Sequence, residues 1–229
     1  MTRRLAALLA LCIGLAPALV LPHGVEEHAA PPPAEPLFDP PEPGSYELPP
    51  ITRVRDHQLL DPDGTRAPIL GLSVGQVAIV SFIYRSCSQA DGCPLALATL
   101  RRLDRELAQR AGPDPSVRLV TVSFDPSRDT PEKMAELRGA LEPKGDWRFL
   151  TAPNDAELAP VLRSFGQDVV RLAAPGAADA DVLRHVLKVF LVDANGDVRN
   201  IYSTGFLDTR LILADVETLL GPLAPGEAH

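Results

Sequence analysis

The sequence VAIVSFIYRSCSQADGCP, residues 77–94, decides the fold because it joins an apolar strand to a helix that begins at a proline. Residues 77–84 are apolar almost throughout, which is typical of a central strand covered on both faces. Backbone N–H groups at a helix N-terminus stabilise negative charge, and a thiol placed there has a lowered pKa. Cys87 and Cys93 therefore lie where thiol chemistry is favoured.

The rest of the chain alternates strands and helices around this unit. We expect strands at residues 117–124, 147–150, 187–193 and 198–203, and helices at residues 94–111, 131–141, 154–165 and 208–220. Asn195-Gly196 is a strong hairpin signal, and the turn from Asp61 to Gly64 predicts a first hairpin between residues 51–60 and 66–70. This order predicts an α/β fold, a thioredoxin-like mixed sheet flanked by helices, with an N-terminal hairpin extension.

Two local signals concern the helix at residues 154–165. Asn154, with Glu157 three residues later, resembles a capping box and predicts where the helix begins. Pro160 has no backbone N–H, so we expect a kink or an early break at that point.

Composition and the N-terminal region set the organisation of the chain. Residues 1–22 have basic residues followed by an apolar run near the ~20 residues that span a bilayer, which predicts a signal peptide or a membrane anchor. Residues 23–50 are rich in proline and predict a linker, residues 51–221 the folded domain, and residues 222–229 a tail. We expect a periplasmic or otherwise extracytoplasmic protein, held at the inner membrane if the leader is retained.

The net charge of −8 argues against nucleic acid as a partner, because binding to phosphates requires a basic surface. The 229 residues are enough for one domain with a packed core plus appendages.

Three interpretations of the cysteine pair stay open at this point. Cys12 lies in the leader, so Cys87 and Cys93 are the pair that remains in the folded domain. They could form a structural disulfide, although closing so short a loop stabilises by only about 2 kcal/mol. They could also be a redox-active dithiol, or a soft-metal site in which two thiolates bind Cu(I) and an added imidazole accommodates Cu(II).

A histidine near the pair would favour the metal site. Of the five histidines, His185 stands immediately before the apolar stretch at residues 186–192. In a thioredoxin-like sheet the start of that strand approaches the tip of the helix that carries the cysteines. His185 is therefore the candidate third ligand.

Three motifs, in order, resemble the Sco/SenC family of thioredoxin-like copper-binding proteins, which assist assembly of the dinuclear copper centre of cytochrome c oxidase. They are FIYRSC with the later CP (residues 82–87 and 93–94), SFDPSRDT (residues 123–130), and His185 eight residues before Asp193. The resemblance covers roughly residues 45 to 220. It implies Cys87, Cys93 and His185 as the ligands of copper, Cu(I) or Cu(II).

The chain departs from the family pattern in two places. Five residues separate Cys87 from Cys93, where the family usually has three. Arg85 stands where a smaller polar residue is common, and its charge would favour a thiolate nearby. Asp125 and Arg128 either orient the loop beside the site or simply form the turn before the next helix, and neither is expected to be a ligand.

The resemblance implies an exported copper chaperone, rather than an enzyme, that delivers copper to an apo cupro-protein such as an oxidase subunit. The alternative is a thiol–disulfide oxidoreductase that acts on partner cysteines. Such enzymes usually place a cis-proline opposite the active cysteines, and here the residues are Leu183, Arg184 and His185. They also prefer two residues between the cysteines, so the chaperone is the leading hypothesis. A peroxidase is a more distant alternative.

Overall fold

The computed structural model describes residues 38–87, 89–111, 116–172 and 182–223. Its centre is a six-stranded sheet with the strand order β1-β10-β9-β4-β5-β6. These strands are β1 (Thr52–Arg53), β4 (Val77–Ile83), β5 (Val117–Ser123), β6 (Trp147–Leu150), β9 (Val189–Asp193) and β10 (Asp197–Tyr202). β4, β5 and β6 run parallel, whereas β9 is antiparallel to β4 and β10 is antiparallel to both β9 and β1. The predicted mixed sheet is confirmed.

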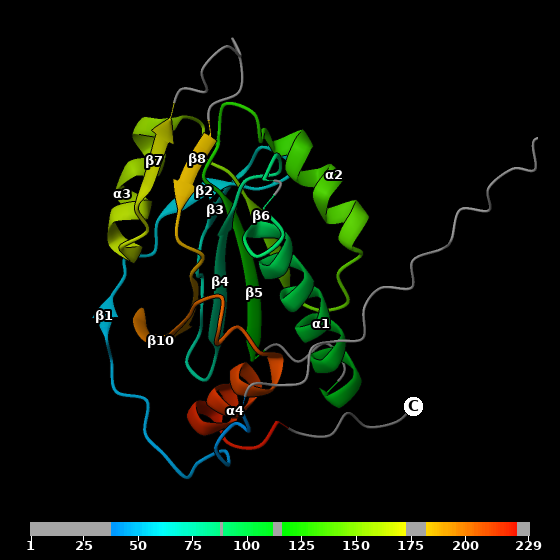
Figure 1. Ribbon diagram of the computed structural model, residues 1–229, viewed down its shortest axis with the longest axis vertical. Coiled ribbons are helices and arrows are strands. Elements are labelled where there is room, and N and C mark those ends of the chain that lie inside the picture. The colour runs from blue at the N-terminus through cyan, green and yellow to red at the C-terminus, as the bar shows by residue number, and fades with distance from the viewer. Residues whose placement is uncertain (1–37, 88, 112–115, 173–181, 224–229) are drawn as a thin grey trace, which may run out of the picture. The chain divides into compact units, whose positions relative to one another are not determined.

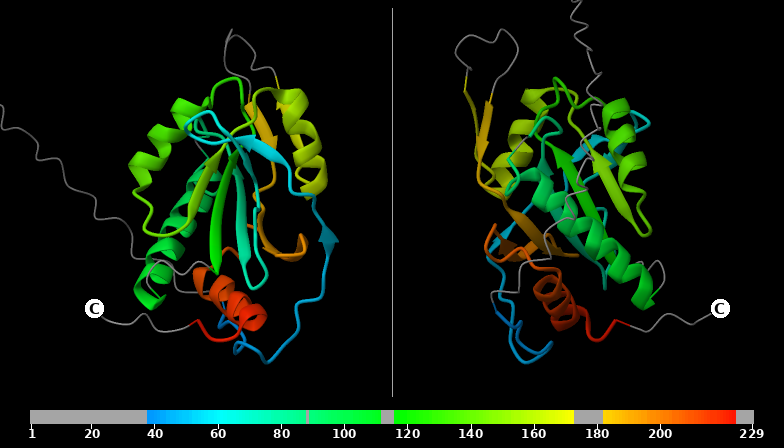
Figure 2. Two further views of the ribbon diagram at one scale, coloured as in Figure 1. Left: turned by 180° about the vertical axis from the view of Figure 1, so that it is seen from behind. Right: turned by 45° about the vertical axis from the view of Figure 1, so that its right-hand side comes forward.

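Four helices flank this sheet: α1 (Cys93–Ala111), α2 (Pro131–Leu141), α3 (Asp155–Phe165) and α4 (Thr209–Leu220). In Figure 1, α1 and α4 lie in front of the sheet, and the view from behind in Figure 2 brings α3 forward. No helix in the described part of the chain is both long and apolar enough to span a bilayer.

The central strand β4 is buried along its whole length, as its apolar sequence predicts. Phe82 on this strand packs edge-on against Phe165 of α3 and Phe190 of β9, with ring centroids 5.1 and 6.0 Å apart. Apolar contacts therefore hold β4 between its neighbours and fix where the strand ends and the cysteine loop begins.

Both predicted hairpins are present, but the first is shorter than predicted, because Thr52 and Arg53 pair with β10 instead. β2 (Gln58–Leu60) pairs antiparallel with β3 (Arg66–Pro68), and Gly64 in the turn between them has φ of 75°. Gly196 between β9 and β10 has φ of 80°, and a Cβ atom there would lie 2.6 Å from the carbonyl oxygen of Val54. A larger residue at position 196 would therefore be strained by both its backbone conformation and the close chain.

The structure contains a third hairpin that the sequence analysis did not predict. β7 (Val169–Leu172) and β8 (Val182–His185) form a separate two-stranded antiparallel sheet. His185 is the last residue of β8, and the next strand of the main sheet, β9, begins only at Val189. The expectation that His185 directly precedes a strand starting at residue 186 is therefore wrong in its local detail.

The predicted early break in the third helix is also wrong. α3 continues through Pro160 to Phe165, and its buried side chains Leu158, Val161 and Phe165 anchor it to the core. Tertiary packing thus offsets the backbone hydrogen bond that proline cannot donate. The start of the helix is as predicted, because the side chain of Asn154 accepts a hydrogen bond from the backbone N–H of Glu157.

Part of the proline-rich segment lies against the folded domain. The ring of Phe38 is 5.7 Å from that of Phe206, and the backbone N–H of Gly44 donates to the Thr218 hydroxyl over 2.9 Å. The carbonyl of Leu48 accepts a hydrogen bond of 2.6 Å from Arg199. The predicted leader, residues 23–37 of the predicted linker and residues 224–229 lie outside the described residues.

Asp215 on α4 joins this segment to the sheet. Its buried carboxylate accepts hydrogen bonds from the hydroxyls of Tyr46 and Tyr202 and from the amide of Asn200, over 2.5, 2.6 and 2.7 Å. Burial, together with this carboxylate, raises the pKa of Tyr46 to about 12 and keeps the hydroxyl protonated as a donor. One carboxylate thus satisfies three polar groups from two segments of the chain, the N-terminal segment and β10.

We predict that Asp215→Ala lowers the free energy of unfolding by about 3 kcal/mol, because three donors lose their common acceptor inside the protein. Thermal unfolding followed by circular dichroism measures the effect. The matched control is Glu217→Ala on the same helix, which removes a surface ion pair with Arg110 and should cost less than about 1 kcal/mol. Equal losses in the two variants would contradict this account.

Candidate functional site

The two cysteines lie on the connection between β4 and α1. α1 begins at Cys93 itself, one residue earlier than predicted, and this side chain is 2% exposed. Cys87 is half-buried, and both thiols are free. The thiol of Cys93 therefore lies at the N-terminal end of a helix, at the close of the connection that follows the buried central strand.

His185 approaches the same point from the end of β8. Its Nε2 atom lies 3.8 Å from Sγ of Cys93, although 92 positions separate the two residues in the chain. Its Nδ1 atom lies 3.0 Å from the carbonyl oxygen of Leu183. A carbonyl can only accept, so Nδ1 carries the proton and the lone pair of Nε2 points toward the cysteine. Histidines that bind metals are commonly oriented in this way.

Two aromatic rings hold the imidazole in place. The ring of Phe124 lies 4.7 Å from that of His185, and the ring of Tyr84 lies 5.7 Å away in an edge-on arrangement. Phe124 follows β5 and Tyr84 follows β4, so the carboxyl ends of the two central strands supply this wall. The sequence analysis did not assign a role to either ring.

The two thiols differ in acidity. Burial raises the pKa of Cys93 to about 12. Burial also acts to raise the pKa of Cys87, but hydrogen bonds from the backbone N–H groups of Cys93 and Gln89, from the Cys93 thiol and from the Tyr84 hydroxyl lower it overall. Cys87 is therefore the more acidic thiol and the one that more readily becomes a thiolate.

The charge of Arg85 is not the leading cause of the lowered pKa of Cys87. Its guanidinium forms an ion pair of 3.2 Å with Glu136 on α2, and backbone N–H groups lead the interactions that lower the pKa of Cys87. The backbone of Arg85 matters more, because its N–H donates to the carboxylate of Asp129 over 3.0 Å.

The SFDPSRDT motif forms a turn that holds the cysteine loop. Asp129 is buried and accepts hydrogen bonds from the Ser123 hydroxyl at 2.6 Å and from the N–H of Arg85. The fully buried carboxylate of Asp125 accepts from the Ser127 hydroxyl at 2.8 Å and pairs with Arg128 at 3.3 Å. The contacts of Asp125 with Ser127 and Arg128 support the turn interpretation of these two residues, and the hydrogen bond from the motif to the cysteine loop comes from Asp129 instead.

The structure thus brings Cys93 and His185 together and places Cys87 beside the N-terminus of the same helix. No three His, Cys, Asp or Glu side chains among the described residues are already arranged to hold a metal ion. The side chains of Cys87 and Cys93 interact with each other, so binding by all three predicted ligands needs both thiols and the imidazole to close around one ion.

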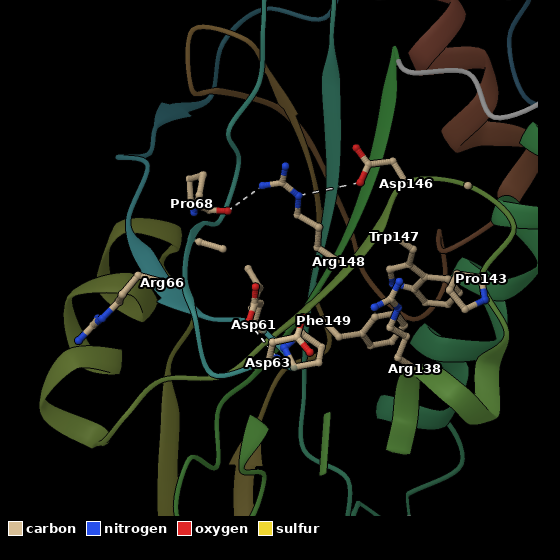
Figure 3. Close-up of a pocket in the computed structure, with 14 residues that line it drawn as sticks. Asp61, Asp63, Arg66, Pro68, Arg138, Pro143, Asp146, Trp147, Arg148 and Phe149 are labelled. Atoms are coloured by element: carbon tan, nitrogen blue, oxygen red, sulfur yellow. Dashed lines mark hydrogen bonds and ion pairs between the residues drawn. The ribbon is translucent and has the colours of Figure 1, made fainter. Parts of the chain in front are cut away.

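A larger hollow, of about 470 Å³, lies away from this site, between the β2–β3 hairpin, β6 and the C-terminal end of α2 (Figure 3). Its lining includes no cysteine or histidine. Arg148 in this hollow donates to the carbonyl of Pro68 at 3.0 Å, and Asp61 accepts from two N–H groups of its own turn. The hydrogen bond from Arg148 to Pro68 joins the hairpin to the sheet, so we assign the hollow a structural role.

The described domain is thus an α/β protein that carries two thiols and an imidazole at the end of its central strands. Residues 53–221 match the family model SCO1/SenC, and the chain belongs to that family. No curated protein matches the sequence.

Solved structures with the same fold support the thioredoxin-like class. ScoI of Bradyrhizobium japonicum, solved with copper bound, is 18% identical, with a TM-score of 0.57 over 71% of this chain and 98% of that one. Apo Sco1 of Thermus thermophilus is 24% identical, with a TM-score of 0.62 over 77% and 96%. BsSco, described as having a disulfide switch and as a member of the Sco family of cytochrome c oxidase assembly proteins, is 24% identical, with a TM-score of 0.54 over 74% and 95%.

We predict that iodoacetamide at pH 7.5 modifies Cys87 at least about ten times faster than Cys93, because Cys87 is both more accessible and more acidic. Mass spectrometry of quenched samples measures the two rates in the native, reduced protein. In the unfolded protein the rates should converge. Faster modification of Cys93 in the native protein would contradict the assignment.

We predict that Asp129→Ala loosens the cysteine loop, because the N–H of Arg85 and the Ser123 hydroxyl lose their buried acceptor. Hydrogen–deuterium exchange should become faster over residues 84–93 while β9 keeps its protection. Glu132→Ala, at the exposed start of α2, is the control and should leave exchange in the loop unchanged. Unaltered exchange in Asp129→Ala would show that other contacts hold the loop.

Proposed function

We propose that the protein is an extracytoplasmic copper chaperone that binds copper through Cys87, Cys93 and His185 and passes it to an apo cupro-protein such as an oxidase subunit. The observation that carries this proposal is the 3.8 Å approach of His185 Nε2 to Cys93 Sγ, with the imidazole proton held on Nδ1 by Leu183. Membership of the SCO1/SenC family supports it, as do the copper-bound structure of a relative and the role in oxidase assembly stated for another.

The donor set suits copper. Thiolates are soft ligands that select Cu(I), and an imidazole extends the site to Cu(II). Binding requires both cysteines to lose their protons, and a cation beside the sulfurs favours that loss even where burial raises the pKa of Cys93. Copper then leaves by ligand exchange, in which each bond to this protein is replaced by a bond to the acceptor.

We predict that the reduced protein binds one equivalent of Cu(I) in a competition titration and that His185→Ala weakens binding by more than about a hundredfold. Loss of a group that only orients a ligand typically costs 10–100-fold, so loss of a ligand should cost more. Cys87→Ser and Cys93→Ser should weaken binding at least as much. The control is His57→Ala, which removes a histidine from the β2 region and should bind copper like the wild type. Wild-type affinity in His185→Ala would remove that residue from the site.

A thiol–disulfide oxidoreductase remains the alternative function, because an acidic, accessible Cys87 beside a buried Cys93 resembles an attacking thiol and its resolving partner. In that reaction the Cys87 thiolate attacks a substrate disulfide, and Cys93 then releases the reduced substrate by forming the Cys87–Cys93 disulfide. Stoichiometric reduction of a disulfide substrate by a protein that binds no copper would favour this function. Tight copper binding without such turnover favours the chaperone.

A further inference from the structure

We propose that the outer face of the β7–β8 hairpin is the surface on which the copper-accepting protein docks. The inference rests on the proposed function and goes beyond it by naming the surface and the chemistry of the partner. The docking surface is defined here as Val170, Arg184 and Val186 with the hollow between them.

Strand register separates the two faces of the hairpin. Val169 pairs with His185 and Val170 with Arg184, and successive side chains of a strand point to opposite faces. Leu183, two residues before His185, is only 1% exposed, so the face that carries both residues is turned toward the protein. The opposite face, with Val170 and Arg184, is turned to solvent.

The docking surface contains large apolar side chains that are unusually exposed to solvent. Val170 is 54% and Val186 is 64% exposed, and they are two of five large apolar side chains so exposed among the described residues. They line a hollow of about 300 Å³ together with Asp168, Arg184 and His185 itself. His185 thus takes part in both places: its imidazole, on the inner face, lies 3.8 Å from the thiol of Cys93, and the residue also borders this hollow.

The position of His185 identifies the kind of molecule that covers the hollow. Copper passes by ligand exchange only if the ligands of the acceptor come within bonding distance of the ion. A protein acceptor that does so must also cover the surface next to His185. A small chelator can reach the ion without covering that surface.

The charged residues of the hairpin indicate which side chains the partner protein presents. The described strands of the hairpin contain two arginines and no acidic residue, in a chain with a net charge of −8. Arg171, on the inner face, lies 3.7 Å from both Asp125 and Asp155. Arg184 is exposed on the outer face, with Asp168 as the acidic residue at the edge of the hollow. The surface therefore fits a protein that presents an apolar side chain to the two valines and a carboxylate to Arg184.

The test compares two acceptors of Cu(I) from the same copper-loaded protein. One is the apo soluble domain of the oxidase subunit that holds the dinuclear copper centre, and the other is the small chelator bathocuproine disulfonate. We expect Val170→Asp and Arg184→Glu each to slow transfer to the protein domain by about tenfold, as for residues at the centre of an interface. Transfer to the chelator and the copper stoichiometry should match the wild type.

Two controls isolate the surface. Val74→Asp changes a valine that is 99% exposed in the connection between β3 and β4, and it should transfer copper like the wild type. Added salt should slow transfer from the wild type to the protein domain and have a smaller effect on Arg184→Glu, because screening acts on an attraction that this variant lacks.

The possible outcomes distinguish a wrong docking surface from a wrong proposed function. Wild-type transfer by both Val170→Asp and Arg184→Glu would overturn the docking surface and leave the chaperone role intact. A wild-type protein that gives copper to the chelator but none to the domain would overturn the surface together with this class of acceptor. A protein that binds no copper would overturn the proposed function itself.

Discussion

Burial of β4 at the centre of the sheet is the constraint on which the rest of the structure depends. This strand is covered along its whole length and lies between β5 and β9. Its carboxyl end therefore has little freedom, and the loop that follows must deliver Cys93 to the first turn of α1. The contact with His185 is possible because a rigid strand and a helix N-terminus define one side of it.

The histidine side of this contact does not belong to the central sheet. His185 comes from a two-stranded hairpin outside the main sheet, and isolated hairpins of this size have little stability of their own. Its imidazole is held by the carbonyl of Leu183 and by the rings of Phe124 and Tyr84. One proposed ligand thus belongs to the core, whereas another belongs to an appended element, which suits the proposed binding and release of copper.

The acidities of the two thiols follow from the same arrangement. Cys93 is buried at the start of α1, and its pKa is raised, whereas Cys87 receives the N–H groups of the loop, and its pKa is lowered. Asp129 holds that loop through the N–H of Arg85 rather than through the arginine's charge. The motif that follows β5 therefore acts on the cysteines through backbone geometry.

The sequence by itself determined the central strand, the cysteine junction, the hairpin turn at Gly196 and the cap at Asn154, because each is encoded by neighbouring residues. It also indicated the three candidate ligands through a family resemblance. Only the tertiary structure decided the β7–β8 hairpin, the tautomer of His185 and the ion pair of Arg85 with Glu136. Those features depend on contacts between segments far apart in the chain, and α3 runs through Pro160 for the same reason: packing against a distant sheet outweighs the local cost.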